Sequence, residues 1–280
     1  MSALTAANNG AVVLRQVDIH FGEGKTAVMA LRGLDLEVAP GEFVSVLGPS
    51  GCGKSTIIGA VAGFTRVSTG EVLVADQPVR APGPDRGVVF QQHTLFPWKT
   101  VLENVAFGLK MQRLNKRARR EAGREVLEQV GLSEFAEHYP HQLSGGMQQR
   151  VNLARVLINR PRVILMDEPF CSLDAQTRLQ MQQMLLALWH QMHMTVVFVT
   201  HDVDEAVFLS DRVVVLTHRP GSVKAELPIP LPRPRTLETL TSGDFTNLKR
   251  HALGLLLAES GSKLVSSKGS LPMPDALSVC

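Results

Sequence analysis

Short apolar runs alternate with amphipathic segments along much of the chain. The runs "EFVSVLG", "GVVFQQ", "RVILMDEP", "MTVVFVTHD" and "DRVVVLTH" are rich in Val and Ile, as buried strands are. Helical patterns such as "TRLQMQQMLLALWHQM" separate them. Buried strands that alternate with helices predict an α/β fold with a parallel sheet. Near the start of the chain, "AVVLRQVDIHF" and "GLDLEV" instead alternate apolar and polar residues, which predicts half-buried strands.

The middle of the chain has little strand signal. "TVLENVAFGLKMQ", "REAGREVLEQVGL" and "GMQQRVNLARVLI" all have helical periodicity, which predicts a helical subdomain at about residues 93–157, inserted into the α/β core. After Arg219 the chain becomes Pro-rich, and one further helix is expected in "DFTNLKRHALGLLLAES". We expect an N-terminal extension (1–10), one main domain (11–245), and a C-terminal helix with a disordered tail (246–280).

Composition narrows the function only a little. The net charge of +3 is too small to indicate nucleic acid. The basic run "NKRARR" is followed by Glu121, Glu125 and Glu128 at helical spacing, which favours a solvated helix face. The three cysteines lack metal-ligand spacing and suit a reducing compartment. The start "MSALTAANNG" has no secretory pattern, and no apolar run approaches the ~18 residues that span a bilayer, so any membrane role is expected to come through a partner.

The stretch "GPSGCGKST" matches the phosphate-binding pattern G-x-x-x-x-G-K-[ST] between a predicted strand and a predicted helix. Glycines let the backbone wrap so that N–H groups point at phosphate oxygens, and the helix N-terminus adds partial positive charge. Lys54 is expected to reach the β- and γ-phosphates, and the Ser55 hydroxyl to bind Mg²⁺. The expected nucleotide-binding residues are Gly48, Pro49, Ser50, Gly51, Cys52, Gly53, Lys54, Ser55 and Thr56.

Three other strand ends carry polar side chains. "RVILMDEPF" ends a buried strand at Asp167, expected to hold Mg²⁺, and Glu168, expected to polarise the attacking water as general base. "VTHD" places His201 where it could stabilise charge near the γ-phosphate. "VVFQQ" ends at Gln91, whose amide could bind Mg²⁺ or orient water. After a phosphate-binding loop, these residues predict nucleotide hydrolysis.

"LSGGMQQR" begins what looks like a second helix N-terminus suited to an anion. Ser144 could simply cap this helix, with glycine allowing the turn. A cap alone leaves both Gly145 and Gly146 without a purpose. The alternative is a phosphate contact to a nucleotide held by another subunit.

Together, the phosphate loop, "FQ", "LSGGMQQR", "MDEP", "SLDA" and "THD" resemble the ATP-binding cassette (ABC) ATPases over about Val12 to Val223. The resemblance implies a P-loop NTPase core with an antiparallel β subdomain and an inserted helical subdomain. It also implies that Phe21 stacks on adenine and that Gln91 links the Mg²⁺ site to a membrane partner. By the same resemblance, the signature includes Ser144, Gly145, Gly146 and Gln148, the D-loop includes Asp174, and His201 is the switch histidine.

The resemblance further implies ATP and Mg²⁺ as cofactors and a head-to-tail homodimer with two ATP molecules between P-loop and signature. "GPDRGVVFQQHTLFPWKTVLENVAFGL" and "LTHRPGSV" look like ATPases of bacterial nitrate, sulfonate or taurine importers. Such a subunit works at the cytoplasmic face of the inner membrane with a transmembrane permease, and indirectly with a periplasmic solute-binding protein. A soluble ABC ATPase acting on nucleic acid or ribosomes is the alternative, disfavoured because no heptad coiled coil interrupts the motifs. A non-enzymatic nucleotide-binding scaffold is a third reading, and Lys54, Asp167, Glu168 and His201 argue against it.

Cys52 has two readings. A helix N-terminus and Lys54 beside it would each lower the pKa of its thiol, so a thiol reagent could block ATP binding. The other reading is a small residue that the loop tolerates.

Overall fold

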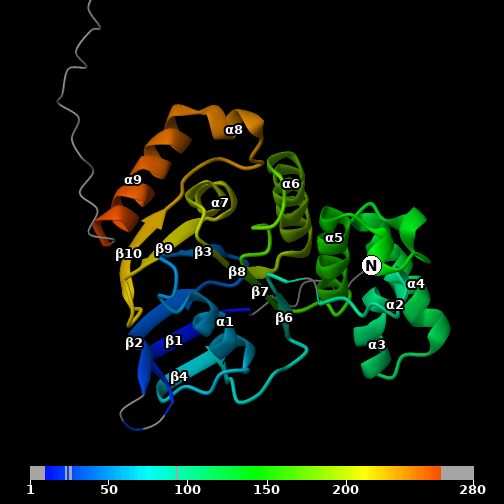
Figure 1. Ribbon diagram of the computed structural model, residues 1–280, viewed down its shortest axis with the longest axis horizontal. Helices are drawn as coiled ribbons and strands as arrows, with labels where there is room; N and C mark the ends of the chain where they lie inside the picture. The colour runs from blue at the N-terminus through cyan, green and yellow to red at the C-terminus, as the bar shows by residue number, and fades with distance from the viewer. Residues whose placement is uncertain (1–9, 23, 25–26, 93, 260–280) are drawn as a thin grey trace, which may run out of the picture.

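The computed structural model describes residues 10–22, 24, 27–92 and 94–259. The predicted tail and nearly all of the predicted N-terminal extension lie outside the described residues. The described part contains a six-stranded and a four-stranded sheet, with helices packed around them (Figure 1).

The larger sheet has the strand order β10-β9-β3-β8-β7-β6. Strands β9, β3, β8, β7 and β6 pair in parallel, and β10 pairs with β9 antiparallel at one edge. The strands are β3 (Phe43–Leu47), β6 (Arg86–Val89), β7 (Val163–Asp167), β8 (Thr195–Thr200), β9 (Arg212–Leu216) and β10 (Val223–Pro228). The expected α/β core with a parallel sheet is therefore confirmed.

Successive residues of the central strands enter two separate hydrophobic clusters. In β8, Val196 and Phe198 face one cluster, while Val197 and Val199 face the other. This alternation follows from the two-residue period of a strand, and both faces need cover because both are apolar. Helices α6 (Ala175–Met192), α7 (Val203–Leu209) and α9 (Gly243–Glu259) cover one face, and α1 (Lys54–Ala62) covers the other (Figure 1).

The smaller sheet is antiparallel, with the order β2-β1-β4-β5. Its apolar side chains join the cluster that contains α1, so this sheet packs on the α1 side of the core. The strands are β1 (Val12–Phe21), β2 (Val28–Val38), β4 (Thr69–Val74) and β5 (Gln77–Pro78). The expected antiparallel β subdomain is confirmed.

The middle of the chain forms helices, as its periodicity predicts. They are α2 (Val101–Val105), α3 (Phe107–Met111), α4 (Lys116–Gln129) and α5 (Gly145–Leu157), with short 3₁₀ turns at Ser133–Phe135 and Pro140–Gln142. The single stretch "TVLENVAFGLKMQ" divides into α2 and α3, which meet at Ala106. Figure 1 shows these helices gathered at one end of the molecule, beside β6. Among the described residues, no helix has the length and apolar character needed to cross a membrane.

The Pro-rich segment after Arg219 is more ordered than its sequence suggests. It contains β10 and then crosses to α7, where the buried Arg235 donates to the carbonyls of Val207, Phe208 and Ser210. The last carbonyls of a helix have no hydrogen-bond partner within the helix. Arg235 supplies partners for those at the C-terminal end of α7. Helix α8 (Leu237–Thr241) follows, and α9 begins at Gly243, so the predicted boundary at residue 245 falls inside this helix.

The reactive-thiol interpretation of Cys52 is wrong. Its side chain is 1% exposed and belongs to the cluster between α1 and the two sheets. Burial raises the pKa of the Cys52 thiol, and the nearby Lys54 ammonium offsets this only in part. The helix terminus and Lys54 are visible in the sequence, whereas the burial that outweighs them comes from the tertiary fold.

We expect Cys52 in the native protein to react with a maleimide far more slowly than the exposed Cys171. A raised pKa leaves less thiolate at a given pH, and burial blocks access. Residue-resolved mass spectrometry after a timed reaction measures both rates. Denatured protein is the control, since there the two thiols should react alike. Equal rates in the native protein would contradict the structure.

Candidate active site

The phosphate-binding loop connects β3 to α1. Gly53 precedes α1 with φ of 103°, a left-handed conformation that favours glycine. A Cβ at this position would lie 2.6 Å from Leu31 Cδ2 and 3.0 Å from the carbonyl oxygen of Ala30. No side chain caps the N-terminus of α1, and no acid stands in its first turn. The helix therefore presents its N–H groups and partial positive charge to an anion.

Lys54 lies over this loop and is 6% exposed. Its Nζ donates to the carbonyls of Gly48 at 2.9 Å and Pro49 at 3.1 Å. The same nitrogen lies 3.9 Å from Glu168 Oε1. A buried ammonium held by loop carbonyls and one carboxylate is poised to bind phosphate oxygens.

Ser55 and Asp167 meet across the gap between α1 and the end of β7. The Ser55 hydroxyl donates to Asp167 Oδ1 at 3.0 Å. Burial raises the pKa of the Asp167 carboxyl, and a cation would favour its charged form. Hydroxyl and carboxylate oxygens are ligands that Mg²⁺ accepts, usually beside waters and substrate phosphates. The predicted pair therefore fits Mg²⁺.

Glu168 lies between two positively charged or ionisable groups. His201 Nδ1 lies 2.9 Å from Glu168 Oε2, and Lys54 lies on the other side of the carboxylate. The backbone of Glu168 has φ of 45°, an uncommon value for a residue with a side chain, and its N–H donates to the carbonyl of Val199 at 2.9 Å. Backbone strain of this kind occurs often at functional sites, where it fixes the direction of a side chain.

Lys54, Ser55 and Glu168 border a pocket of about 290 Å³, whereas Asp167 and His201 are not among its lining residues. Phe21, at the end of β1, contributes a ring that is 48% exposed, so an aromatic face is available beside the P-loop. Sequence reasoning missed three lining residues: Val28, Ala30 and Arg219. Arg219 Nε donates to the carbonyl of Gly51 at 3.2 Å, which ties the loop after β9 to the P-loop. Its only sequence signal was its place in "LTHRPGSV".

Gln91 lies two residues after β6, and no hydrogen bond joins it to Asp167 in the described part of the chain. Its Nε2 lies 3.4 Å from the sulfur of Cys171, in the loop that follows Glu168. Gln91 is also absent from the residues that line the 290 Å³ pocket. Its amide lies beside the loop that follows Glu168, and its role as a Mg²⁺ ligand stays a prediction.

The signature residues lie at the N-terminus of α5. Ser144 caps the helix, because its hydroxyl accepts the N–H of Met147 at 3.3 Å. A Cβ on Gly146 would lie 2.5 Å from Thr177 Cγ2 in α6, so close packing requires glycine there. A Cβ on Gly145 would meet no atom within 4 Å. Helix capping therefore explains why Ser144 is at its position, and close packing explains Gly146. No contact in the described chain explains why position 145 is a glycine.

Gln148 and Asp174 support this region. Gln148 Nε2 donates to the carbonyls of Pro140 and Leu143. Asp174 caps α6 by accepting the N–H of Thr177 at 3.0 Å, and this hydrogen bond lowers the pKa of the Asp174 carboxyl. No residue of the signature, nor Asp174, lines the pocket that contains the P-loop. The N-termini of α1 and α5 are thus two separate features of one chain.

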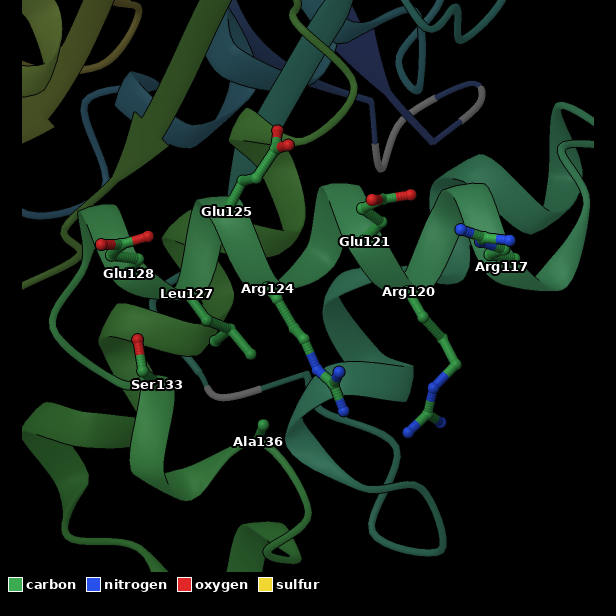
Figure 2. A pocket seen from close by; sticks show the side chains of 9 residues that line it. All are labelled: Arg117, Arg120, Glu121, Arg124, Glu125, Leu127, Glu128, Ser133 and Ala136. Carbon is green, nitrogen blue, oxygen red and sulfur yellow. The ribbon is translucent and has the colours of Figure 1, made fainter.

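A second hollow, of about 530 Å³, runs along α4. Figure 2 shows Arg120 and Arg124 on one side of this helix and Glu121, Glu125 and Glu128 on the other. Arg120 Nη2 forms an ion pair with Glu137 Oε1 at 2.7 Å, and Arg124 Nη2 lies 3.6 Å from the same oxygen. Mixed, partly paired charges along this part of α4 agree with the expected solvated helix face.

Known proteins resemble this chain closely. The sequence model of a family described as ABC transporter matches residues 31–171. An uncharacterised ABC transporter ATP-binding protein of Methanocaldococcus jannaschii is 52% identical over 83% of this chain and 86% of its own length. The nitrate import ATP-binding protein NrtD of Synechocystis is 47% identical over 74% of this chain and 77% of its own length.

Two further comparisons concern a longer protein and a solved structure. The bicarbonate transport ATP-binding protein CmpC of Synechococcus elongatus is 49% identical over 76% of this chain but only 32% of its own length. The dimeric post-hydrolysis structure of the ATP-binding cassette MJ0796, bound to ADP and Pi, superposes with a TM-score of 0.70 at 35% identity, covering 79% of this chain and all of that one. The chain therefore belongs to the ABC transporter family, as an ATP-binding cassette that hydrolyses ATP.

Proposed function

We propose that this chain is the ATP-hydrolysing subunit of a bacterial importer, acting as a homodimer that drives a transmembrane permease. One observation carries the hydrolytic part. The Ser55 hydroxyl donates to Asp167 beside the P-loop. The next residue, Glu168, lies within hydrogen-bond reach of His201 and within ion-pair reach of Lys54. Phosphate-binding, metal-binding and proton-accepting groups are thereby held side by side.

In the proposed reaction, ATP enters the 290 Å³ pocket with its adenine against Phe21 and its phosphates on the P-loop. Lys54 exchanges its loop carbonyls for β- and γ-phosphate oxygens. Ser55 and Asp167, with Gln91 after a change of position, would hold Mg²⁺, which neutralises charge on the phosphates.

Glu168 then acts as the general base. Its carboxylate accepts a proton from water while the water oxygen attacks the γ-phosphorus and the bond to the ADP oxygen breaks. The hydrogen bond from His201 keeps the Glu168 carboxylate oriented toward the pocket. His201 is itself exposed, so its free ring nitrogen can contact the γ-phosphate.

The homodimer supplies the second half of each site. Gly145 faces open space beside the capping Ser144, and the P-loop pocket of the same chain does not include them. A head-to-tail dimer would place these residues over the ATP of the partner, as a two-fold axis permits. The solved relative bound to ADP and Pi is described as dimeric, which supports this arrangement.

A groove of about 520 Å³ near Gln91 offers a surface for the permease. It lies between β6 and the helices α3 and α5, and the exposed side chains of Phe90 and Met111 contribute to it. Movement of Gln91 during the ATP cycle would be passed to a partner seated there. This surface would place the subunit at the cytoplasmic face of the inner membrane.

The solute is proposed from relatives. Proteins named for nitrate import and bicarbonate transport are 47% and 49% identical over most of this chain, which favours nitrate, a sulfonate, taurine or a similar small solute. A periplasmic solute-binding protein would deliver it. Transport names among these relatives favour import over action on nucleic acid or ribosomes.

Replacement of Glu168 by Gln is expected to lower ATP turnover by about 10²–10⁴-fold, the usual contribution of a general base. The amide keeps the size of the side chain but cannot accept the proton. Phosphate release measures turnover, and equilibrium binding should show that ATP affinity is retained. Glu134→Gln, on the exposed 3₁₀ turn, is the matched control and should be fully active. Near-normal hydrolysis by Glu168→Gln would refute the assignment.

Replacement of Ser144 by Arg is expected to abolish hydrolysis while dilute, monomeric protein still binds ATP. The long cation would obstruct the partner's nucleotide but not the P-loop of its own chain. Ser144→Ala loses the same helix cap, at a cost of about 1 kcal/mol, and controls for stability. If Ser144→Arg weakens monomeric ATP binding as strongly as hydrolysis, the signature serves its own P-loop and the dimer proposal fails.

A further inference from the structure

A small cationic pocket lies where α2, α3 and the start of α4 meet. Its volume is about 80 Å³, and it shares no lining residue with the ATP pocket. Five of its lining residues are basic, namely Lys99, Lys110, Lys116, Arg119 and Arg120, and one, Glu103, is acidic. We propose that this pocket and the aromatic residues beside it bind the phosphate groups of anionic lipids at a membrane surface.

Most of the positive charge in this pocket is not neutralised. Arg120 pairs with Glu137, and the Glu103 carboxylate accepts the N–H of Thr100 in a capping box. Lys99, Lys110, Lys116 and Arg119 form no ion pair with a carboxylate among residues 10–22, 24, 27–92 and 94–259. Several cations near one another without counter-charges repel each other, so an anion bound among them would relieve that repulsion.

The start of α4 adds to this field. Its first turn contains Lys116 and Arg117 and no acidic residue. The N-terminal end of a helix carries partial positive charge and favours Asp or Glu, so basic side chains there reduce helix stability. The helix begins nonetheless, because Asn115 caps it by accepting the N–H of Ala118 at 2.9 Å. Positive charge is thus concentrated at a position where it disfavours the helix itself.

An exposed aromatic group adjoins the cations. Trp98 is 71% exposed, and its ring lies 5.8 Å from that of Phe96, which in turn lies 4.7 Å from Phe107. The ammonium of Lys99 lies 5.9 Å from the Phe107 ring centroid, so the aromatic and basic groups form one surface. The buried Asn104 donates to the carbonyls of Phe96 and Lys99, which holds this loop in place.

Lipid phosphates fit this surface better than a protein or nucleic acid partner does. An exposed Trp beside Lys and Arg is the combination found at membrane–water interfaces, where the indole lies at headgroup level and the cations meet anionic lipids. The exposed Leu114 extends the apolar part. The proposal does not rest on the proposed function, because it concerns the chain alone.

The test uses the purified full chain and vesicles of phosphatidylcholine, with and without phosphatidylglycerol. The chain has two tryptophans, and Trp189 is buried, so a blue shift of emission on mixing reports Trp98. We expect a blue shift and cosedimentation with the anionic vesicles only, and loss of both at high salt. Trp98→Phe should remove the blue shift.

Charge reversal identifies the surface. Lys110→Glu with Lys116→Glu should weaken vesicle partitioning by about tenfold or more, since each cation near an anionic surface adds to the attraction. A Glu at position 116 suits the first turn of α4, whereas a Glu at position 110 replaces the cation in the last turn of α3, so these two effects oppose each other and thermal stability should change little. Arg66→Glu with Arg80→Glu changes net charge equally at exposed positions outside the pocket, and should retain most of the binding.

Three outcomes would overturn the proposal: no binding to anionic vesicles, equal loss in the control variant, or a stronger preference for an oligonucleotide than for the vesicles. Loss of permease binding in the charge-reversed variant, without vesicle binding by the parent, would instead assign the surface to a protein partner. ATP hydrolysis in solution should be unchanged in both variants. Failure of vesicle binding with hydrolysis intact would therefore leave the proposed function standing.

Discussion

Parallel pairing of β3, β8 and β7 is the constraint on which the ATP site depends. In register, Leu47 of β3 pairs with Thr200 of β8, and Asp167 of β7 pairs with Val199. The carboxyl ends of three strands therefore meet at one edge of the sheet, where parallel α/β proteins commonly bind ligands. Lys54 follows β3, Glu168 follows β7, and His201 follows β8. Both sheet faces are buried, so a shift of one residue would move apolar side chains to the wrong cluster and separate these groups.

This arrangement brings together the residues proposed to hydrolyse ATP. It does not bring the signature residues of α5 to the same pocket. Ser55 hydrogen-bonds to Asp167, and Lys54 lies within ion-pair distance of Glu168. Ser144 and Gly145 form the N-terminus of α5 and lie outside that pocket. A helix terminus with an open glycine beside it is what a second copy of the chain would need in order to approach a bound nucleotide. The proposed dimer follows from this division.

Much of the site could be predicted from the sequence because its chemistry resides in short motifs at strand ends. Lys54, Asp167 and Glu168 are examples, since a strand followed by a loop places them whatever the rest of the chain does. Contacts between distant segments could not be predicted in this way. Arg219 reaches Gly51 from the loop after β9, 168 residues further along the chain. Arg235 is buried against α7, although "LPRPR" reads as a Pro-rich segment. The pKa of Cys52 was misjudged for the same reason, because burial by other elements outweighs the local charges.

The central claim is that each ATP site is shared between two copies of the chain. The most direct measurement mixes two inactive variants, Lys54→Ala and Ser144→Arg, and follows phosphate release. In a mixed dimer, one site would combine the intact P-loop of one chain with the intact signature of the other, so activity should return on mixing. A mixture as inactive as its two parents, under conditions where the chains exchange and associate, would contradict the account.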